Sequence, residues 1–132
     1  MIKESKWIGF DLDGTLAQTT VGNTIGKPIK PMIDLLLKIY HEGKYQVKIF
    51  TARAESREKT DLINQWLRVH HLPDVEITNI KDSKCVLIID NIAVRVFKDS
   101  GVICHECLNS LLIQFSANLL DDKPQTVNAE LL

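Results

Sequence analysis

The sequence predicts an α/β domain whose central, mostly parallel sheet is covered by helices on both faces. Short apolar runs alternate along the chain with longer segments in which apolar residues recur at three-to-four spacing, as strands alternate with amphipathic helices. The runs Trp7–Phe10 and Cys85–Ile89 are apolar almost throughout, as expected of strands buried on both faces. These observations favour a three-layer, Rossmann-like domain with about five strands.

The expected elements follow one another in a regular order. Strands are predicted at residues 7–10, 46–50, 74–78, 85–89 and 93–97, and helices from about 31 to 42, 56 to 70 and 103 to 119. Gly43 and Pro73 mark the ends of the first two helices. The loop at residues 17–30 is too short for a separate cap domain, so we expect one cap-less domain over residues 1–132, with residues 121–132 as a tail.

Composition excludes several classes of function. The 132 residues carry a formal net charge of −1 and the pI is about 6.4, so no basic surface for nucleic acid or anionic membrane is expected. The chain shows no signal-peptide pattern and no apolar stretch of about 18 residues, which a membrane span needs. Three cysteines without secretory context indicate a reducing compartment. We therefore expect a soluble, cytoplasmic protein.

Polar residues follow three of the buried strands directly. Asp11 and Asp13 come after the first strand, Thr51 after the second, and Asp90 with Asn91 after the fourth. The carboxyl ends of parallel strands meet at one edge of a sheet, where ligands bind. Carboxylates at one point repel each other unless a cation lies between them, and oxygen ligands favour Mg²⁺. The sequence therefore predicts a magnesium site at this edge.

Two further residues extend this chemistry. Gly14 permits a tight backbone turn that lets main-chain groups approach a ligand. Lys81, ahead of the fourth strand, offers a positive charge for an anion. Carboxylates, a metal ion, a hydroxyl and a lysine together suit phosphoryl transfer, in which catalysis is mostly positioning and charge neutralisation.

The same residues carry a resemblance to the haloacid dehalogenase (HAD) superfamily. The run FDLDGTL at residues 10–16 resembles its first motif, hydrophobic-Asp-x-Asp-Gly-Thr-Leu. The run VKIFT at residues 47–51 is similar to its second, Lys81 to its third, and Asp90 with Asn91 to its fourth. The motifs stand in the family's order over residues 7–97. The segment 25–29 and the FTAR run also resemble small bacterial and phage members with little or no cap.

The resemblance implies a role for each of these residues. Asp11 would be the nucleophile that forms an aspartyl-phosphate, and Asp13 the general acid and base. Thr51 would hydrogen-bond the transferring phosphoryl group, and Lys81 would neutralise its charge. Mg²⁺ would be held by four residues: Asp11, Asp13 (also through its carbonyl), Asp90 and Asn91. The implied activity is magnesium-dependent hydrolysis of a small phosphate ester.

The remaining substrate contacts are expected from the residues themselves. Beside Gly14, Thr51 and Lys81, they are Ala52 and Arg53. Arg53 fits equally well as a solvated cation at the start of a helix. Lys84 is a rival to Lys81, which we prefer because it leaves room for a turn before the strand that begins at Cys85.

Asn91 departs from the family's Asp-Asp pair and favours a second hypothesis. An amide oxygen can bind Mg²⁺ but brings no charge, so metal affinity should fall. The alternative function is a non-catalytic HAD-like module that binds an anion or a protein. A receiver-like phospho-acceptor domain shares the acidic cluster, but the DLDGTL run fits it poorly. The sequence predicts neither the particular phosphate ester nor the oligomeric state.

Cys104 and Cys107 have the spacing of a metal-binding or redox pair. No second pair of ligands stands at zinc spacing. Both cysteines also fall on or beside the apolar stripe of the last predicted helix, where a free cysteine behaves as a small hydrophobe. Packing is therefore the favoured interpretation.

Overall fold

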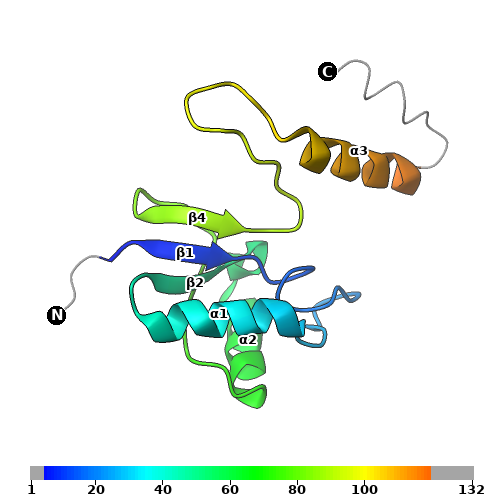
Figure 1. Ribbon diagram of the computed structural model, residues 1–132. Helices are drawn as coiled ribbons and strands as arrows, with labels where there is room; N and C mark the ends of the chain where they lie inside the picture. The colour runs from blue at the N-terminus through cyan, green and yellow to red at the C-terminus, as the bar shows by residue number, and fades with distance from the viewer. Residues whose placement is uncertain (1–4, 120–132) are drawn as a thin grey trace. The chain divides into compact units, whose positions relative to one another are not determined.

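The computed structural model describes residues 5–119, which divide into two compact units between Asn91 and Ile92. The first unit contains β1 (Trp7–Phe10), α1 (Lys30–Glu42), β2 (Gln46–Phe50), the short 3₁₀ helix η1 (Ala52–Glu55), α2 (Arg57–Val69), β3 (Glu76–Thr78) and β4 (Cys85–Ile89) (Figure 1). The second contains α3 (His105–Leu119). The sequence predicts one domain over residues 1–132. The predicted tail lies outside the described residues.

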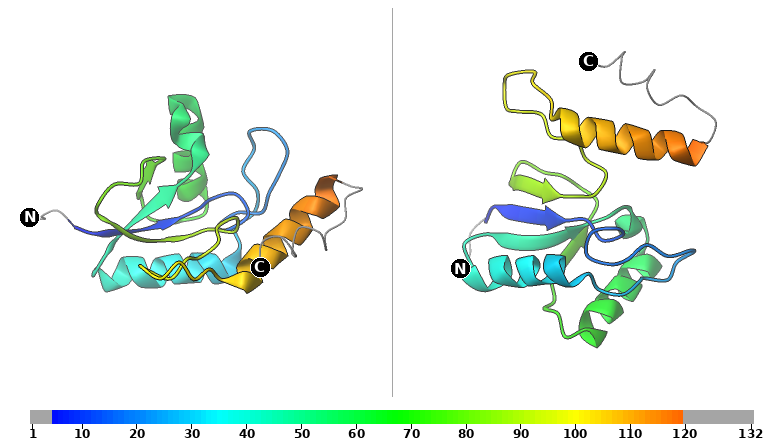
Figure 2. Two further views of the ribbon diagram at one scale, coloured as in Figure 1. Left: turned by 90° about the horizontal axis from the view of Figure 1, so that it is seen from above. Right: turned by 45° about the vertical axis from the view of Figure 1, so that its right-hand side comes forward.

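The first unit is built on a parallel sheet of four strands in the order β3-β2-β1-β4. The strands β4, β1 and β2 lie side by side in Figure 1 and in the right-hand view of Figure 2. Phe10 pairs with Ile49 on one side and with Ile89 on the other. The carboxyl ends of these three strands therefore meet at one edge. The predicted α/β, Rossmann-like arrangement is confirmed, and the described residues contain no cap.

The prediction of a fifth strand at residues 93–97 is wrong. These residues belong to the second unit, where Val96 and Ile103 form an isolated antiparallel bridge. Phe97 N donates to the Val102 carbonyl (2.8 Å) and Cys104 N to the Arg95 carbonyl (2.8 Å). The apolar run therefore finds its backbone partners in the segment just after it, and the sheet has four strands.

One face of the sheet carries the core of the first unit. Alternate positions of β1 and β2 join α1 and α2 in one buried cluster, which includes Ile8, Phe10, Val47, Ile49, Ile33, Leu36, Ile63, Trp66 and Leu67. Successive strand residues point to opposite faces, so the intervening Trp7 and Phe50 face the other way, with their rings 6.3 Å apart. Both long helices of this unit contribute side chains to the buried cluster.

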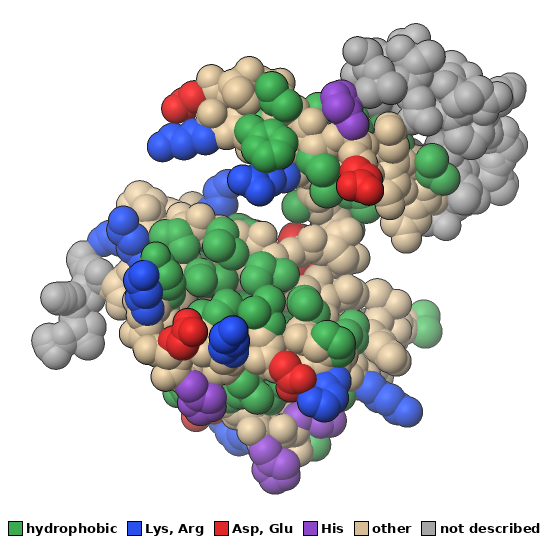
Figure 3. All heavy atoms as spheres, in the orientation of Figure 1, with side chains coloured by type: hydrophobic (Ala, Val, Ile, Leu, Met, Phe, Trp, Pro, Cys, Tyr) green, Lys and Arg blue, Asp and Glu red, His purple; other side chains and the backbone are tan. Residues whose placement is uncertain are grey.

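Strand β4 forms an edge of the sheet and is only partly covered within its unit. Val86 and Leu87 are exposed, although Ile89 packs against the core cluster. Figure 3 shows hydrophobic side chains grouped over β4 and β1, beside α1. No helix among residues 5–119 is long and apolar enough to cross a membrane.

The ends of the two long helices follow from local chemistry. Pro31 stands in the first turn of α1, where its missing N–H costs nothing. Gly43 ends α1 with a φ of 71°, and its N–H donates to the Ile39 carbonyl. Ser56 caps α2 by accepting a hydrogen bond from Lys59 N (3.1 Å). These ends lie within a residue or two of those predicted and place the start of α2 directly after η1.

Candidate functional site

The chain turns directly after β1 and thereby places Asp11 and Asp13 at the carboxyl edge of the sheet. Asp11 N donates to the Ile89 carbonyl (2.9 Å), which continues the pairing of β1 with β4. The Leu12 carbonyl then accepts from Ala17 N (2.9 Å), and Gly14 N donates to the Ala17 carbonyl (2.8 Å). Backbone bonds thus close the turn, and both carboxylates project from a fixed position.

Thr15 and Asn91 hold the Asp11 carboxylate. Thr15 Oγ1 donates to Asp11 Oδ2 (3.1 Å). The Asn91 amide nitrogen, in the orientation that satisfies both amide atoms, donates to Asp11 Oδ2 (2.7 Å), to the Asp13 carbonyl (3.1 Å) and to Thr15 Oγ1 (3.2 Å). Gly14 has a φ of 88°, and a Cβ there would lie 2.7–3.0 Å from this amide. Glycine is therefore required where the turn passes Asn91.

Asp13 forms a bidentate ion pair with Arg53. Arg53 Nε donates to Asp13 Oδ2 (2.8 Å) and Nη2 to Oδ1 (2.9 Å). The same guanidinium donates to the carbonyls of Asn23 (2.8 Å) and Thr24 (2.9 Å). The Arg53 side chain is only 13% exposed, so these charge-assisted bonds are partly shielded from water. Arg53 therefore ties the second carboxylate, the loop after the turn and η1 into one assembly.

Thr51 lies at the end of β2, on the same edge as the two aspartates. It is buried, and its N–H donates to the Thr78 carbonyl (2.9 Å). Its Oγ1 accepts from Arg53 N (3.1 Å), which caps η1. Ala52 is the first residue of η1. The predicted set Asp11, Asp13, Gly14, Thr51, Ala52 and Arg53 thus comes together at this edge.

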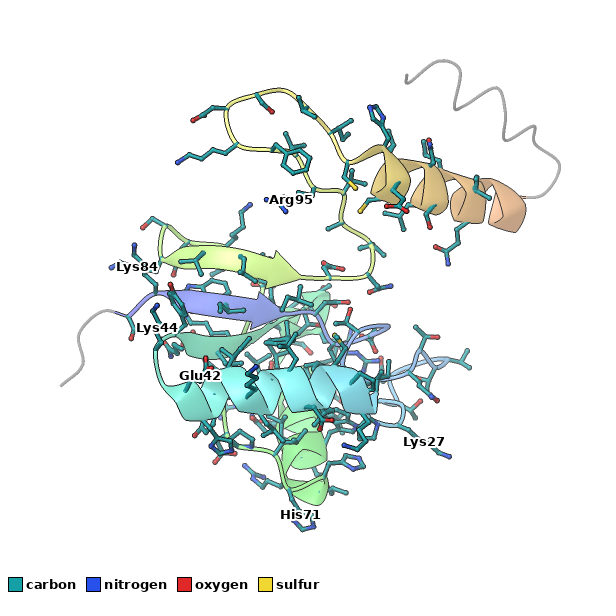
Figure 4. The ribbon with its side chains drawn as sticks, viewed as in Figure 1. Lys27, Glu42, Lys44, His71, Lys84 and Arg95 are labelled. Atoms are coloured by element: carbon teal, nitrogen blue, oxygen red, sulfur yellow. The ribbon has the colours of Figure 1, made fainter. Side chains whose placement is uncertain are left out.

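Lys81 is not brought to this edge. Residues 79–84 lead from the carboxyl end of β3 to the amino-terminal end of β4, so Lys81 stands midway along this connection. Trp7 N donates to the Lys84 carbonyl (3.0 Å), and Figure 4 shows Lys84 at the amino-terminal end of β4. Burial raises the pKa of the Cys85 thiol, and the nearby Lys81 charge opposes that rise. Lys81 therefore lies beside the start of β4, and Arg53 is the cation that meets the aspartates.

The surroundings of Asp11 disfavour its charge. Burial, followed by the nearby charge of Asp90, raises the pKa of Asp11 to about 6. The hydrogen bond from Thr15 lowers the pKa only in part, and Asp13 adds to the rise. Asp90, which follows β4, is thus close enough to act on Asp11. The carboxyl group changes its charge near neutral pH.

We expect the stability difference between the wild type and Asp11→Asn to depend on pH. The folded-state pKa, about 6, exceeds the ordinary 3.8, so the folded chain binds the proton more tightly than the unfolded chain between these values. The wild-type free energy of unfolding should therefore fall as the pH rises from about 4 to 6. The fall is on the order of 1 kcal/mol after allowance for solvent screening of a half-exposed carboxyl.

Thermal denaturation of both proteins between about pH 4 and 7.5 checks this expectation. Asparagine does not titrate, so the free energy of unfolding of the variant should not fall with this group. The stability of the variant relative to the wild type should therefore increase as the pH rises. A difference that stays constant across the series would show that the folded-state pKa of Asp11 is ordinary.

The oxygen atoms around Asn91 fit a small divalent cation. Asp11 Oδ2 and the Asp13 carbonyl converge on the same amide nitrogen, and carboxylate and carbonyl oxygens are the ligands that Mg²⁺ prefers. A half-turn of the amide would present the Asn91 oxygen to the same point. Among residues 5–119, no three His, Cys, Asp or Glu side chains are grouped as a metal site. A cation here would therefore depend on the Asp13 carbonyl and the Asn91 oxygen as well as on carboxylates.

A cavity of about 400 Å³ adjoins the loop that Arg53 holds. Its lining is Asn23, Thr24, Ile25, Leu62, Gln65, Trp66 and Val69. Trp66 Nε1 donates to the Gly26 carbonyl (2.9 Å), which anchors the loop to α2. A Cβ on Gly26 would overlap the Gln18 carbonyl. The loop is therefore closely packed at its base and presents apolar surface beside the site.

Sequence reasoning missed two parts of this site. Thr15 stands inside the run that resembles the first HAD motif, so its place four residues after Asp11 was an available signal. The second part is the pair of carbonyls of Asn23 and Thr24. The sequence holds no signal for them, because every residue carries a carbonyl and only the folded loop selects these two.

Comparison with known proteins found no matching family model and no matching curated protein. Among solved structures, a conserved protein from Bacteroides thetaiotaomicron is similar at 18% sequence identity and a TM-score of 0.49. The alignment covers 90% of this chain and 100% of that one. The structure therefore defines the fold class, which is an α/β Rossmann-like arrangement with a polar carboxyl edge.

Proposed function

We propose that the protein is a magnesium-dependent phosphate-ester hydrolase that works through an aspartyl-phosphate on Asp11. The observation that carries the proposal is the convergence of Asp11 with Asp13, Arg53 and Thr51 at the carboxyl edge. The first, second and fourth motifs that resemble the HAD superfamily support the same chemistry. We also propose a cytoplasmic location and a small phosphorylated substrate.

The proposed reaction has two steps that share one pair of carboxyl groups. In the first, an Asp11 oxygen attacks phosphorus, the bond to the ester oxygen breaks, and Asp13 gives that oxygen a proton. In the second, Asp13 takes a proton from water, whose oxygen attacks the aspartyl-phosphate and releases inorganic phosphate. Bound Mg²⁺, held by Asp11, the Asp13 carbonyl, Asp90 and Asn91, would supply charge neutralisation.

Arg53 has a defined part in this sequence. Asp13 must carry a proton to act as an acid, and in the resting site Arg53 donates to both of its oxygens. A phosphate group offers oxygens that a guanidinium binds in the same bidentate way as it binds a carboxylate. The arriving substrate would therefore draw Arg53 away from Asp13. Arg53 would then supply the positive charge expected of Lys81.

Phosphate release with and without MgCl₂ tests the proposal. The panel should include an aryl phosphate, esters of small polar alcohols, and esters with larger apolar groups that can reach the cavity beside Asn23 and Thr24. Magnesium-dependent release from at least one ester is the expected result. No release of phosphate from any ester, with folding verified by circular dichroism, would contradict the proposal.

Asn91 favours one alternative, a non-catalytic module that binds an anion or a protein. Its amide nitrogen already donates to Asp11 Oδ2 and to the Asp13 carbonyl, which are the oxygens expected to bind Mg²⁺. An internal hydrogen-bond donor thus competes with the metal. The alternative predicts no detectable Mg²⁺ binding at millimolar concentration.

We expect Asn91→Asp to tighten Mg²⁺ binding at least about tenfold. The substitution removes the competing N–H donor and adds a charged oxygen ligand, and ligand charge strengthens binding of such cations. Isothermal titration with MgCl₂ measures the change. Gln46→Glu, at an exposed position at the amino-terminal end of β2, adds the same charge at the opposite edge and should leave the affinity unchanged. An equal gain in both variants would trace the effect to net charge instead of ligation.

A further inference from the structure

Cys104 and Cys107 lie together at the start of α3. Cys104 immediately precedes the helix, whose first residue is His105, and its carbonyl accepts the first helical hydrogen bond, from Leu108 N (3.1 Å). Cys107 N donates to Cys104 Sγ (3.4 Å), as a backbone N–H does to an N-cap side chain. The two sulfur atoms share a hydrogen bond and are 3.1 Å apart. Both residues are free cysteines of intermediate exposure, so these side chains meet each other and are not buried in a core.

The backbone before the helix holds this arrangement. Cys104 N donates to the Arg95 carbonyl (2.8 Å), next to the bridge between Val96 and Ile103. Cys104 is therefore fixed by a backbone pair on one side and by the helix on the other. The two sulfurs lie 3.1 Å apart, and a disulfide needs them about 2.0 Å apart with the Cβ atoms about 3.5–4.5 Å apart. Because Cys104 stands before the first helical residue of α3, its backbone can supply the remaining shift. Closure requires no unwinding of α3.

The two thiols differ in acidity. The hydrogen bond with Cys107 lowers the pKa of Cys104, and the backbone N–H of Cys107 adds to the effect. The same hydrogen bond raises the pKa of Cys107. A thiolate is the attacking species in disulfide exchange. Together with the Cys107 N–H at Cys104 Sγ, these directions favour Cys104 as the first nucleophile and Cys107 as the resolving thiol.

We propose that Cys104 and Cys107 form a thiol–disulfide exchange site, which a low-molecular-weight disulfide oxidises reversibly to an intramolecular disulfide. Cys104 sulfur attacks one sulfur of the disulfide RSSR, whose S–S bond breaks, giving a mixed disulfide and one RS⁻. Cys107 sulfur then attacks Cys104 sulfur and releases the second RS⁻. The two protein thiols are oxidised, RSSR is reduced to two RSH, and the two protein protons balance the two thiols formed. This site is independent of the proposed hydrolase activity.

Cys85 provides an internal control. It lies at the start of β4 in the other unit, and its Sγ contacts the Leu87 carbonyl (3.6 Å). Burial raises the pKa of Cys85. We therefore expect it to react slowly and, when it does, to stop at a mixed disulfide.

Equilibration of the full chain with reduced and oxidised glutathione, followed by alkylation and mass spectrometry, tests the proposal. The expected product has lost two hydrogen atoms, carries no glutathione, and contains a Cys104–Cys107 cross-link. Cys104→Ser and Cys107→Ser should each prevent this product, and Cys107→Ser should accumulate glutathione on Cys104. Dithiothreitol should restore the wild-type dithiol. Glutathione adducts on the wild type without the cross-link would overturn the proposal.

Reaction rates with an aromatic disulfide at about pH 7.5 provide a second readout that does not depend on the cross-link. Cys104 should react at least about tenfold faster than Cys85. Cys107→Ala should slow Cys104 several-fold, because the hydrogen bond to its sulfur is lost, and Cys107→Ser should restore part of the rate. Circular dichroism of each variant verifies that the helices are retained. Equal rates for Cys104 and Cys85 in a folded protein would also overturn the proposal.

Discussion

Asp11→Asn is expected to lower phosphate-ester turnover by at least about 1,000-fold, because an amide oxygen is a poor nucleophile and removal of a covalent nucleophile costs on this scale. The loss should appear in kcat for every ester that the wild type hydrolyses. Asparagine keeps the size of the side chain and an oxygen that can accept from Thr15. The fold should therefore persist, and the variant should be at least as stable as the wild type at neutral pH.

Two controls make this result specific. Asp61→Asn, at an exposed position on α2, removes one carboxylate elsewhere and should leave kcat unchanged. Acid quenching of the wild type during turnover should trap phosphate on Asp11 as an acyl phosphate that hydroxylamine cleaves. Turnover by Asp11→Asn at the wild-type rate would rule out Asp11 as the nucleophile.

Arg53→Ala is expected to lower kcat/KM by roughly 100-fold, a typical loss when one charge-stabilising donor is removed. The variant loses the guanidinium that we propose moves to the substrate phosphate, and the loop carbonyls of Asn23 and Thr24 lose their donor. Arg53→Lys keeps the charge but cannot bind two oxygens in a fork. We therefore expect it to recover only part of the loss, chiefly through KM.

A structural readout separates the two parts of this effect. In Arg53→Ala, limited proteolysis should cut the loop at residues 19–26 faster than in the wild type, because its anchor to η1 is gone. Arg68→Ala, which removes an exposed arginine in the last turn of α2, should change neither kinetics nor proteolysis. Faster cleavage with unchanged kinetics would show that Arg53 holds the loop only.

The sequence predicted the elements of the first unit because each has a local cause. Trp7–Phe10 is apolar and ends at a turn, and α1 begins at a proline and ends at a glycine. The convergence of Asp11, Asp13 and Thr51 followed from the geometry of parallel strands alone. The prediction of a strand at residues 93–97 failed because an apolar run does not specify its pairing partner. Here the partner is the next segment of the chain.

The partners of individual side chains were harder to predict. Arg53 was expected to contact substrate, yet whether it faces solvent, Asp13 or a loop depends on how residues 17–29 pack on α2. Lys81 was assigned by its place in the sequence ahead of a strand. Its position in space depends on the path of a six-residue connection, which sequence order does not define. We expect Asn91 to offer an oxygen to a cation, and which of its amide atoms faces Asp11 depends on neighbours that the sequence does not specify.

The guanidinium of Arg53 occupies two roles that cannot be separated in the resting protein. While it bonds to Asp13 it also closes the loop at Asn23 and Thr24, so freeing the acid and loosening the loop are a single event. In the proposed reaction, a phosphate that binds Arg53 would release both Asp13 and the loop, and departure of the product would restore both contacts. The residues that set how readily the site opens would then be those of the loop, whose side chains take no part in the chemistry.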